Sequence, residues 1–86
     1  EGVPVFEINK SVLNQSVNVV DLLVEHTRIF SAKGELRRLI AGNGLSINKE
    51  KFSNPDTIIG SSYLINNKYI LIQKGKKNYY IIKVND

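Results

Sequence analysis

Residues 33–48 read KGELRRLIAGNGLSIN, a helical pattern, a glycine-containing turn and a strand pattern in direct succession. Leu36, Leu39 and Ile40 recur at the spacing of one helix face, so they predict an amphipathic helix. Gly42-Asn43-Gly44 supplies the left-handed conformations that end a helix and turn the chain. The last four residues then predict a short strand whose side chains point to alternate sides. This succession indicates an α+β domain.

The helix of this stretch is expected to cover about residues 32–41. Ser31 is its expected N-cap, because a serine hydroxyl can accept from the first unpaired N–H groups. If the cap is one residue later, Glu35 occupies the capping-box position. Arg37 and Arg38 are expected to project away from the core, since each residue advances about 100° around the helix axis.

An earlier helix is predicted to begin after Asn18, which can cap it, and to continue to about His26. Val17 can pack against Leu22 as a hydrophobic staple. The residues at the spacing of a buried stripe are Val20, Leu23, Val24 and Thr27. A connection formed by residues 28–30 is expected to send the second helix back against the first.

The first 15 residues contain a short alternating stretch that is interrupted by Pro4. A proline lacks the N–H that an interior strand must donate, so we interpret residues 1–15 as an edge strand or as a linker from a preceding domain. The domain itself is expected to cover residues 16–86.

The end of the chain predicts a β-hairpin. Residues 69–73 and 79–84 are rich in β-favouring side chains and flank a loop at residues 74–78. Tyr79 and Tyr80 are neighbours on one strand, so one of them must face the core and the other the opposite side.

The positive charge is unevenly distributed along the 86 residues. Twelve basic and eight acidic side chains give a net charge of +4, and residues 1–30 carry −2, so residues 31–86 carry +6. A basic patch on a small domain attracts polyanions and suggests a nucleic acid as partner, although solvated lysines are common on any protein surface.

Composition excludes several kinds of site. The chain has no cysteine and a single histidine, so neither a disulfide framework nor a multi-ligand metal site is expected. No apolar run approaches the roughly 20 residues that span a bilayer, and no segment resembles a signal peptide, so a cytoplasmic location without membrane attachment is expected. The chain begins at Glu1 and contains no methionine, which predicts a fragment excised from a longer protein.

The candidate RNA contacts are basic and polar side chains of the second helix, the turn and strand after it, and the hairpin loop. They are Lys33, Arg37, Arg38, Asn43, Ser46, Asn48, Lys74, Lys76 and Lys77. Guanidinium groups suit phosphate because they donate in a planar fork, although exposed helix arginines are also common as solvated residues. The loop lysines can contact phosphate or simply keep the hairpin soluble. The asparagines and the serine can donate to RNA or bond their own backbone.

No catalytic residue is expected. His26 has no nucleophile beside it in the pattern, and nothing marks any two of the acidic residues as an acid and base pair.

The order of these elements resembles the α-L RNA-binding motif of small ribosomal subunit protein four and its relatives. Within that superfamily the chain is most similar to the C-terminal domain of bacterial tyrosyl-tRNA synthetases. The family's Asp-Leu-Leu-Val-Glu helix, Lys-Gly-Glu-x-Arg-Arg helix and Gly-Lys-Lys-x-Tyr run correspond to Asp21 to Glu25, Lys33 to Arg38 and Gly75 to Tyr79. The likeness extends from about Val3 through Val84. Ala32 stands where the family often has a serine, and Asn43-Gly44 where it often has two glycines.

The resemblance implies two packed helices followed by a small, mainly antiparallel sheet that ends in a hairpin. It implies tRNA as the partner, held at the long variable arm and the anticodon side of tyrosine tRNA. It also implies a larger enzyme that attaches tyrosine with ATP and forms a homodimer through its catalytic domain. The ATP-handling signatures His-Ile-Gly-His and Lys-Met-Ser-Lys-Ser do not occur here. We therefore expect this chain to be a monomer that has no catalytic site and needs no cofactor.

Two other interpretations remain open from the sequence. Pseudouridine synthases and ribosome-rescue factors carry the same motif, usually near their N-terminus, whereas this chain ends directly after the hairpin. A protein-interaction domain would instead present an exposed apolar patch where we expect the arginines.

Overall fold

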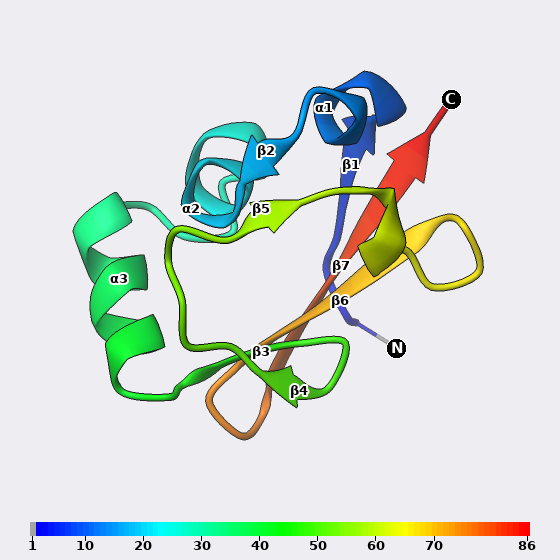
Figure 1. Ribbon diagram of the computed structural model, residues 1–86. Coiled ribbons are helices and arrows are strands. Elements are labelled where there is room, and N and C mark those ends of the chain that lie inside the picture. The colour runs from blue at the N-terminus through cyan, green and yellow to red at the C-terminus, as the bar shows by residue number, and fades with distance from the viewer. Residues whose placement is uncertain (1) are drawn as a thin grey trace.

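A five-stranded sheet with helices along one side organises the chain (Figure 1). The computed structural model describes residues 2–86. The helical elements are α1 (Lys10–Asn14), α2 (Val19–Asp21), the π-helix η1 (Leu22–His26), α3 (Lys33–Ala41) and the 3-10 helix η2 (Ser61–Tyr63). The strands are β1 (Val5–Asn9), β2 (Val17–Asn18), β3 (Leu45–Ile47), β4 (Glu50–Lys51), β5 (Ile58–Ile59), β6 (Tyr69–Lys74) and β7 (Asn78–Asn85).

The strand order in the main sheet is β1-β7-β6-β3-β4, while β2 and β5 form a separate pair. β1 runs parallel to β7, and the other neighbours are antiparallel. The predicted hairpin is confirmed, with a loop shortened to residues 75–77 because Lys74 and Asn78 also pair. The predicted α+β class with a mainly antiparallel sheet is confirmed as well.

The sheet has one buried face. Ile70, Ile72 and Ile82 are fully buried on it, because alternate residues of a strand point to the same side. The helices contribute to the same core through Val19, Val20, Leu22, Leu23, Leu36 and Ile40. Tyr80 packs against this core, whereas Tyr79 is exposed on the opposite face. The predicted separation of the two tyrosines is therefore confirmed.

Asn18 caps the first helical segment, as the sequence predicted. Its Oδ1 accepts from the backbone N–H of Val20 at 2.7 Å, and its Nδ2 donates to the carbonyl of Pro55 at 3.2 Å. The asparagine thus ends β2, starts α2 and ties both to the loop before β5.

The predicted helix from after Asn18 to His26 is confirmed in its extent, but after Asp21 it continues as the π-helix η1. The backbone N–H and the hydroxyl of Thr27 both donate to the carbonyl of Leu22, five residues earlier, at 3.1 and 3.0 Å. This wider turn changes the buried face: Leu22 joins Leu23 in the core, and Val24, predicted as a core residue, is only partly buried.

The helix α3 begins after Ala32, so the prediction of Ser31 as its N-cap is wrong, and the alternative start one residue later is confirmed. Ala32 has the extended conformation of a cap but cannot supply a side-chain hydrogen bond. The Ser31 hydroxyl instead donates to Oε1 of Glu35 at 3.2 Å and holds that carboxylate beside the first turn, where the helix dipole favours negative charge.

Residues 5–14 pack into the same body as the rest of the described chain. β1 lies at the edge of the main sheet, as one of the two sequence interpretations expected. Ile8 of β1 and Leu13 of α1 are buried among the core residues. The other interpretation, that residues 1–15 are a linker from a preceding domain, stays a prediction.

Candidate nucleic-acid interface

Three segments that are distant in the sequence meet around the C-terminal end of α3. The backbone N–H of Gly75, in the β6–β7 loop, donates to the carbonyl of Gly44 at 2.7 Å. The Nζ of Lys51, on β4, donates to the carbonyl of Asn43 at 3.0 Å. In Figure 1 the end of α3, β4 and the orange β6–β7 loop lie along the lower edge of the molecule.

Arg37 and Arg38 are exposed on α3, as predicted. Within residues 2–86 neither arginine has an ion-pair partner. Arg38 extends back along the helix, since a Cβ built on Gly34 would lie 3.5 Å from its Nη1. The helical spacing places Arg37 one turn after Lys33, on the same flank. Both guanidinium groups are available to an external anion.

Lys33 is held by acidic side chains of the preceding helix. Its Nζ lies 2.9 Å from Oε2 of Glu25 and 3.1 Å from Oδ1 of Asp21. The hydrogen bond to Glu25, followed by the one to Asp21, raises the pKa of Lys33 above its ordinary value of 10.5. The ammonium group therefore joins α3 to α2 and η1, and its contact with RNA stays a prediction.

The three lysines of the hairpin differ in their surroundings. The Nζ of Lys74 lies 3.7 Å from Oε2 of Glu35 and 5.6 Å from the centroid of the Phe30 ring, which a cation can approach favourably. Lys76 and Lys77 are exposed in the loop, and the part of the chain described by the structure offers neither an ion pair. Lys76 and Lys77 can therefore contact an anion directly, whereas Lys74 would first have to give up its contacts with Glu35 and Phe30.

The three polar candidates after α3 also differ. Asn43 is exposed in the turn, with a left-handed φ of 60°. Ser46 is only 8% exposed, because β3 is paired on both sides. Asn48 donates from Nδ2 to the carbonyl of Tyr63 at 2.7 Å and accepts at Oδ1 from the N–H of Leu71 at 3.0 Å. Ser46 is therefore buried in the sheet, and the side chain of Asn48 is occupied by hydrogen bonds within the domain. Of the three, only Asn43 is exposed to solvent.

Lys51 belongs to this surface although it was not among the sequence candidates. Asn48 and Lys49 have φ values of 53° and 72°, which make a tight turn that folds β4 back onto β3. Two successive left-handed residues are typical of the hairpin turns with a two-residue loop. The strand predicted from the sequence included Asn48, whereas the structure places Asn48 in the turn, so the position of Lys51 was not predicted.

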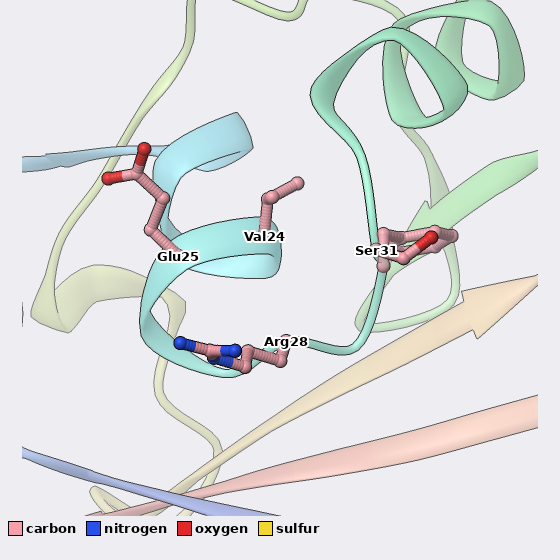
Figure 2. A pocket seen from close by; sticks show the side chains of 5 residues that line it. Val24, Glu25, Arg28 and Ser31 are labelled. Atoms are coloured by element: carbon pink, nitrogen blue, oxygen red, sulfur yellow. The ribbon is translucent and has the colours of Figure 1, made fainter.

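A hollow of about 560 Å³ lies beside the connection between η1 and α3. Figure 2 shows Val24 on the helix and Ser31 on the connection across from it, with Arg28 between them along the chain. Glu25 also lines this hollow, so its positive and negative charges offset each other. Among the described residues, no group of three or more possible metal ligands occurs. The hollow therefore lacks the excess positive charge of a phosphate site.

These features define a small α+β domain of the type found in small ribosomal subunit protein four, with two packed helical segments, a turn, a strand and a final hairpin. Five exposed basic side chains that have no ion pair within residues 2–86 lie on the three segments that meet at the end of α3: Arg37, Arg38, Lys51, Lys76 and Lys77. No helix within residues 2–86 has both the length and the apolar character needed to cross a bilayer.

The chain belongs to the family described as Tyrosine--tRNA ligase SYY-like C-terminal domain, whose model matches residues 1–82. The tyrosine--tRNA ligase of Bacteroides fragilis is 49% identical over 82 residues, which are 95% of this chain and 19% of that protein. That of Bacteroides thetaiotaomicron is 46% identical over 82 residues, with the same coverage of 95% and 19%. That of Cytophaga hutchinsonii is 45% identical over 87 residues, 99% of this chain and 20% of that protein.

The chain thus spans about a fifth of the length of the relatives it matches. The family resemblance seen in the sequence is confirmed. The match favours this family over the pseudouridine synthases and ribosome-rescue factors that the sequence left open.

Proposed function

We propose that this domain binds tRNA and grips the long variable arm and the anticodon side of tyrosine tRNA. In this proposal a separate catalytic domain of a longer tyrosine–tRNA ligase attaches tyrosine with ATP. Family membership supports the tRNA partner and the parent enzyme. The single observation that supports the binding role most strongly is the hydrogen bond from Gly75 to Gly44, which brings the lysine loop to the end of the arginine helix.

The proposed binding surface, called here the basic end, consists of Arg37, Arg38, Lys51, Lys76 and Lys77. All five are exposed. They carry five of the ten positive charges of residues 31–86. Structured RNA is recognised largely through its backbone and shape, so a cluster of cations without a deep pocket suits such a ligand.

The three acidic side chains beside the helices set the border of the basic end. Asp21 and Glu25 neutralise Lys33, and Glu35 neutralises Lys74. A phosphate would be repelled from these carboxylates, so the RNA backbone is expected to cross the end of α3 and to avoid its start. Lys33 and Lys74 then act mainly by positioning the helix and the hairpin.

In this proposal the domain supplies binding and the chemistry belongs elsewhere. The separate chain is a cytoplasmic monomer that needs no cofactor, and the parent enzyme dimerises through its catalytic domain. The separate domain should therefore neither activate tyrosine nor hydrolyse ATP.

A titration of the domain with two tRNAs, one with a long and one with a short variable arm, tests the proposal. The long-armed tRNA should bind more tightly. The logarithm of its binding constant should fall with the logarithm of salt concentration, by roughly 0.7–0.9 for each phosphate neutralised. Absence of binding to both tRNAs, or binding that does not respond to salt, would contradict the proposal.

A further inference from the structure

The face of the sheet opposite the core is open and partly apolar. Tyr79 on β7 lies beside Gln73 of β6, and Ile81 lies beside both Leu71 of β6 and Val5 of β1. Side chains of directly paired residues lie on the same face of a sheet. Val5 and Tyr79 are 52% and 37% exposed, respectively. We call this surface the outer face.

A hollow of about 420 Å³ lies between the first segment of the chain and the start of β7, beside the hairpin loop. It is lined by residues 2–4 and 77–80. The carbonyl of Pro4 accepts from the N–H of Ile81 at 2.9 Å, which holds the first segment of the chain against β7. An exposed aromatic ring from Tyr79, an exposed amide from Asn78 and an exposed ammonium group from Lys77 therefore border one concave site.

We propose that this hollow receives one unpaired nucleobase of the bound RNA, stacked on Tyr79, with Lys77 at the adjoining phosphate. The inference rests on the proposed function, because it names a further contact with the same RNA. Unpaired bases stack on tyrosine rings, and cationic side chains beside the ring follow the backbone. The Asn78 amide can donate to and accept from the edge of the base.

The hollow continues the basic end. Lys77 is two residues after Gly75, which is bonded to Gly44 at the end of α3. A backbone that is held by the arginines and the loop lysines can therefore reach Tyr79 without crossing an acidic patch. A protein partner fits the outer face less well, because Lys83 and Gln73 lie among its apolar residues, and lysine is depleted in protein–protein interfaces.

The test compares Tyr79→Ala, Tyr79→Phe and Tyr69→Ala. Tyr69 is a matched control, since it is 38% exposed and is paired with Lys83 at the other end of the hairpin. The affinity of each variant is measured for the long-armed tRNA and for a blunt RNA duplex without unpaired bases. Tyr79→Ala should weaken tRNA binding by about 5- to 100-fold and leave both the salt dependence and duplex binding unchanged. Tyr79→Phe and Tyr69→Ala should bind tRNA like the wild type.

Fluorescence gives a second measurement that does not depend on the alanine variant being folded. The chain contains no tryptophan, so Tyr79→Trp introduces a single reporter. Addition of the long-armed tRNA should quench its emission by stacking, whereas the emission of a Tyr69→Trp variant should stay nearly constant.

Four results would overturn the stacking site: unchanged tRNA affinity in a folded Tyr79→Ala variant, an equal loss on the blunt duplex, an equal loss in Tyr69→Ala, or an unquenched Tyr79→Trp. A wild-type dimer that Tyr79→Ala dissociates would show instead that the outer face is a protein interface. If the wild type itself binds no tRNA, the proposed function fails and this inference fails with it. If the wild type binds tRNA in a salt-dependent way but the Tyr79 variants behave like it, the stacking site is refuted and the proposed function stands.

Discussion

Replacement of Gly44 by alanine tests how the turn after α3 is packed. A Cβ at Gly44 would lie 2.4 Å from Cδ1 of Leu39 and 3.2 Å from its Cγ. The backbone of Gly44 is fixed on both sides, because its N–H donates to the carbonyl of Leu39 at 2.8 Å and its carbonyl accepts from Gly75 at 2.7 Å. The glycine is therefore required for close approach, and the new methyl group must displace the Leu39 side chain.

The expected loss of stability follows from which atom must move. Extra methyl groups in a packed core typically cost about 1–3 kcal/mol. Leu39 is only partly buried, and the clashing atom is the end of its side chain, which can change rotamer. We therefore expect Gly44→Ala to destabilise the domain by about 1–2 kcal/mol, which corresponds to a fall in Tm of about 4–16 °C for a domain of this size.

Gly34→Ala is the matched control. Gly34 is exposed in α3, and its new Cβ would meet only Nη1 of Arg38, at an ordinary contact distance of 3.5 Å. Alanine is favoured over glycine in a helix by about 0.5–1 kcal/mol, so this variant should be as stable as the wild type or more stable.

Urea denaturation followed by circular dichroism measures both variants. A combination of Gly44→Ala with Leu39→Ala should be less destabilised than the sum of the two single changes, since the smaller side chain removes the clash. The reasoning is refuted if Gly44→Ala unfolds at the same urea concentration as the wild type, or if Gly34→Ala is the less stable of the two glycine variants.

Three other changes address single contacts. Asn18→Ala removes the cap of α2 and should lower the free energy of unfolding by about 0.5–2 kcal/mol, and an unchanged thermal melt would contradict the cap's role. Asn48→Ala leaves two backbone groups without partners and should cost about 2–4 kcal/mol, while tRNA affinity of the folded variant stays the same; weaker binding without loss of stability would make it an RNA contact. The pKa of Lys33 is raised, chiefly by Glu25, so its ion pairs stabilise the fold below pH 10.5 and lose that effect as pH rises through the higher folded-state value. In that alkaline range, Tm should fall less with rising pH for Lys33→Ala than for the wild type. An equal fall of Tm in both proteins would contradict this.

The local signals in the sequence were sufficient for the elements whose cause is local. The hairpin was predicted almost to its ends, because both strands have β-favouring runs and the loop residues separate them. The cap at Asn18 was predicted because its hydrogen bonds reach only two and three residues ahead. The exposure of Arg37 and Arg38 followed from helical spacing alone.

The errors in the helices lie where one side-chain hydrogen bond decides the local structure. The π-helix η1 depends on Thr27 bonding the carbonyl of Leu22, which no propensity of either residue predicts. Ser31 has the chemistry of a cap, but its hydroxyl is directed to Glu35 and the helix starts one residue later.

The candidate site shows the same limit. Lys33 has the same charge and a similar place in the sequence pattern as Arg37, yet only the lysine meets acidic partners from another helix. Asn48 is occupied by Tyr63 and Leu71, which lie 15 and 23 residues away in the sequence. Such partners cannot be predicted from spacing within one element. Lys33 and Asn48 were therefore predicted as RNA contacts on the same grounds as the exposed residues.

The most direct test of the basic end is the salt-dependent tRNA affinity of a double variant, Arg37→Ala with Arg38→Ala. Each well-formed charged contact contributes about 1.5–3 kcal/mol, so affinity should fall by at least about 10-fold. The salt slope should become shallower by about 1.4–1.8 if both arginines hold phosphates. Lys68→Ala serves as the charge control, since Lys68 is exposed near the start of β6, away from the hairpin loop, and should bind tRNA like the wild type. A folded double variant with unchanged affinity and unchanged salt slope would contradict the account and place the RNA surface elsewhere.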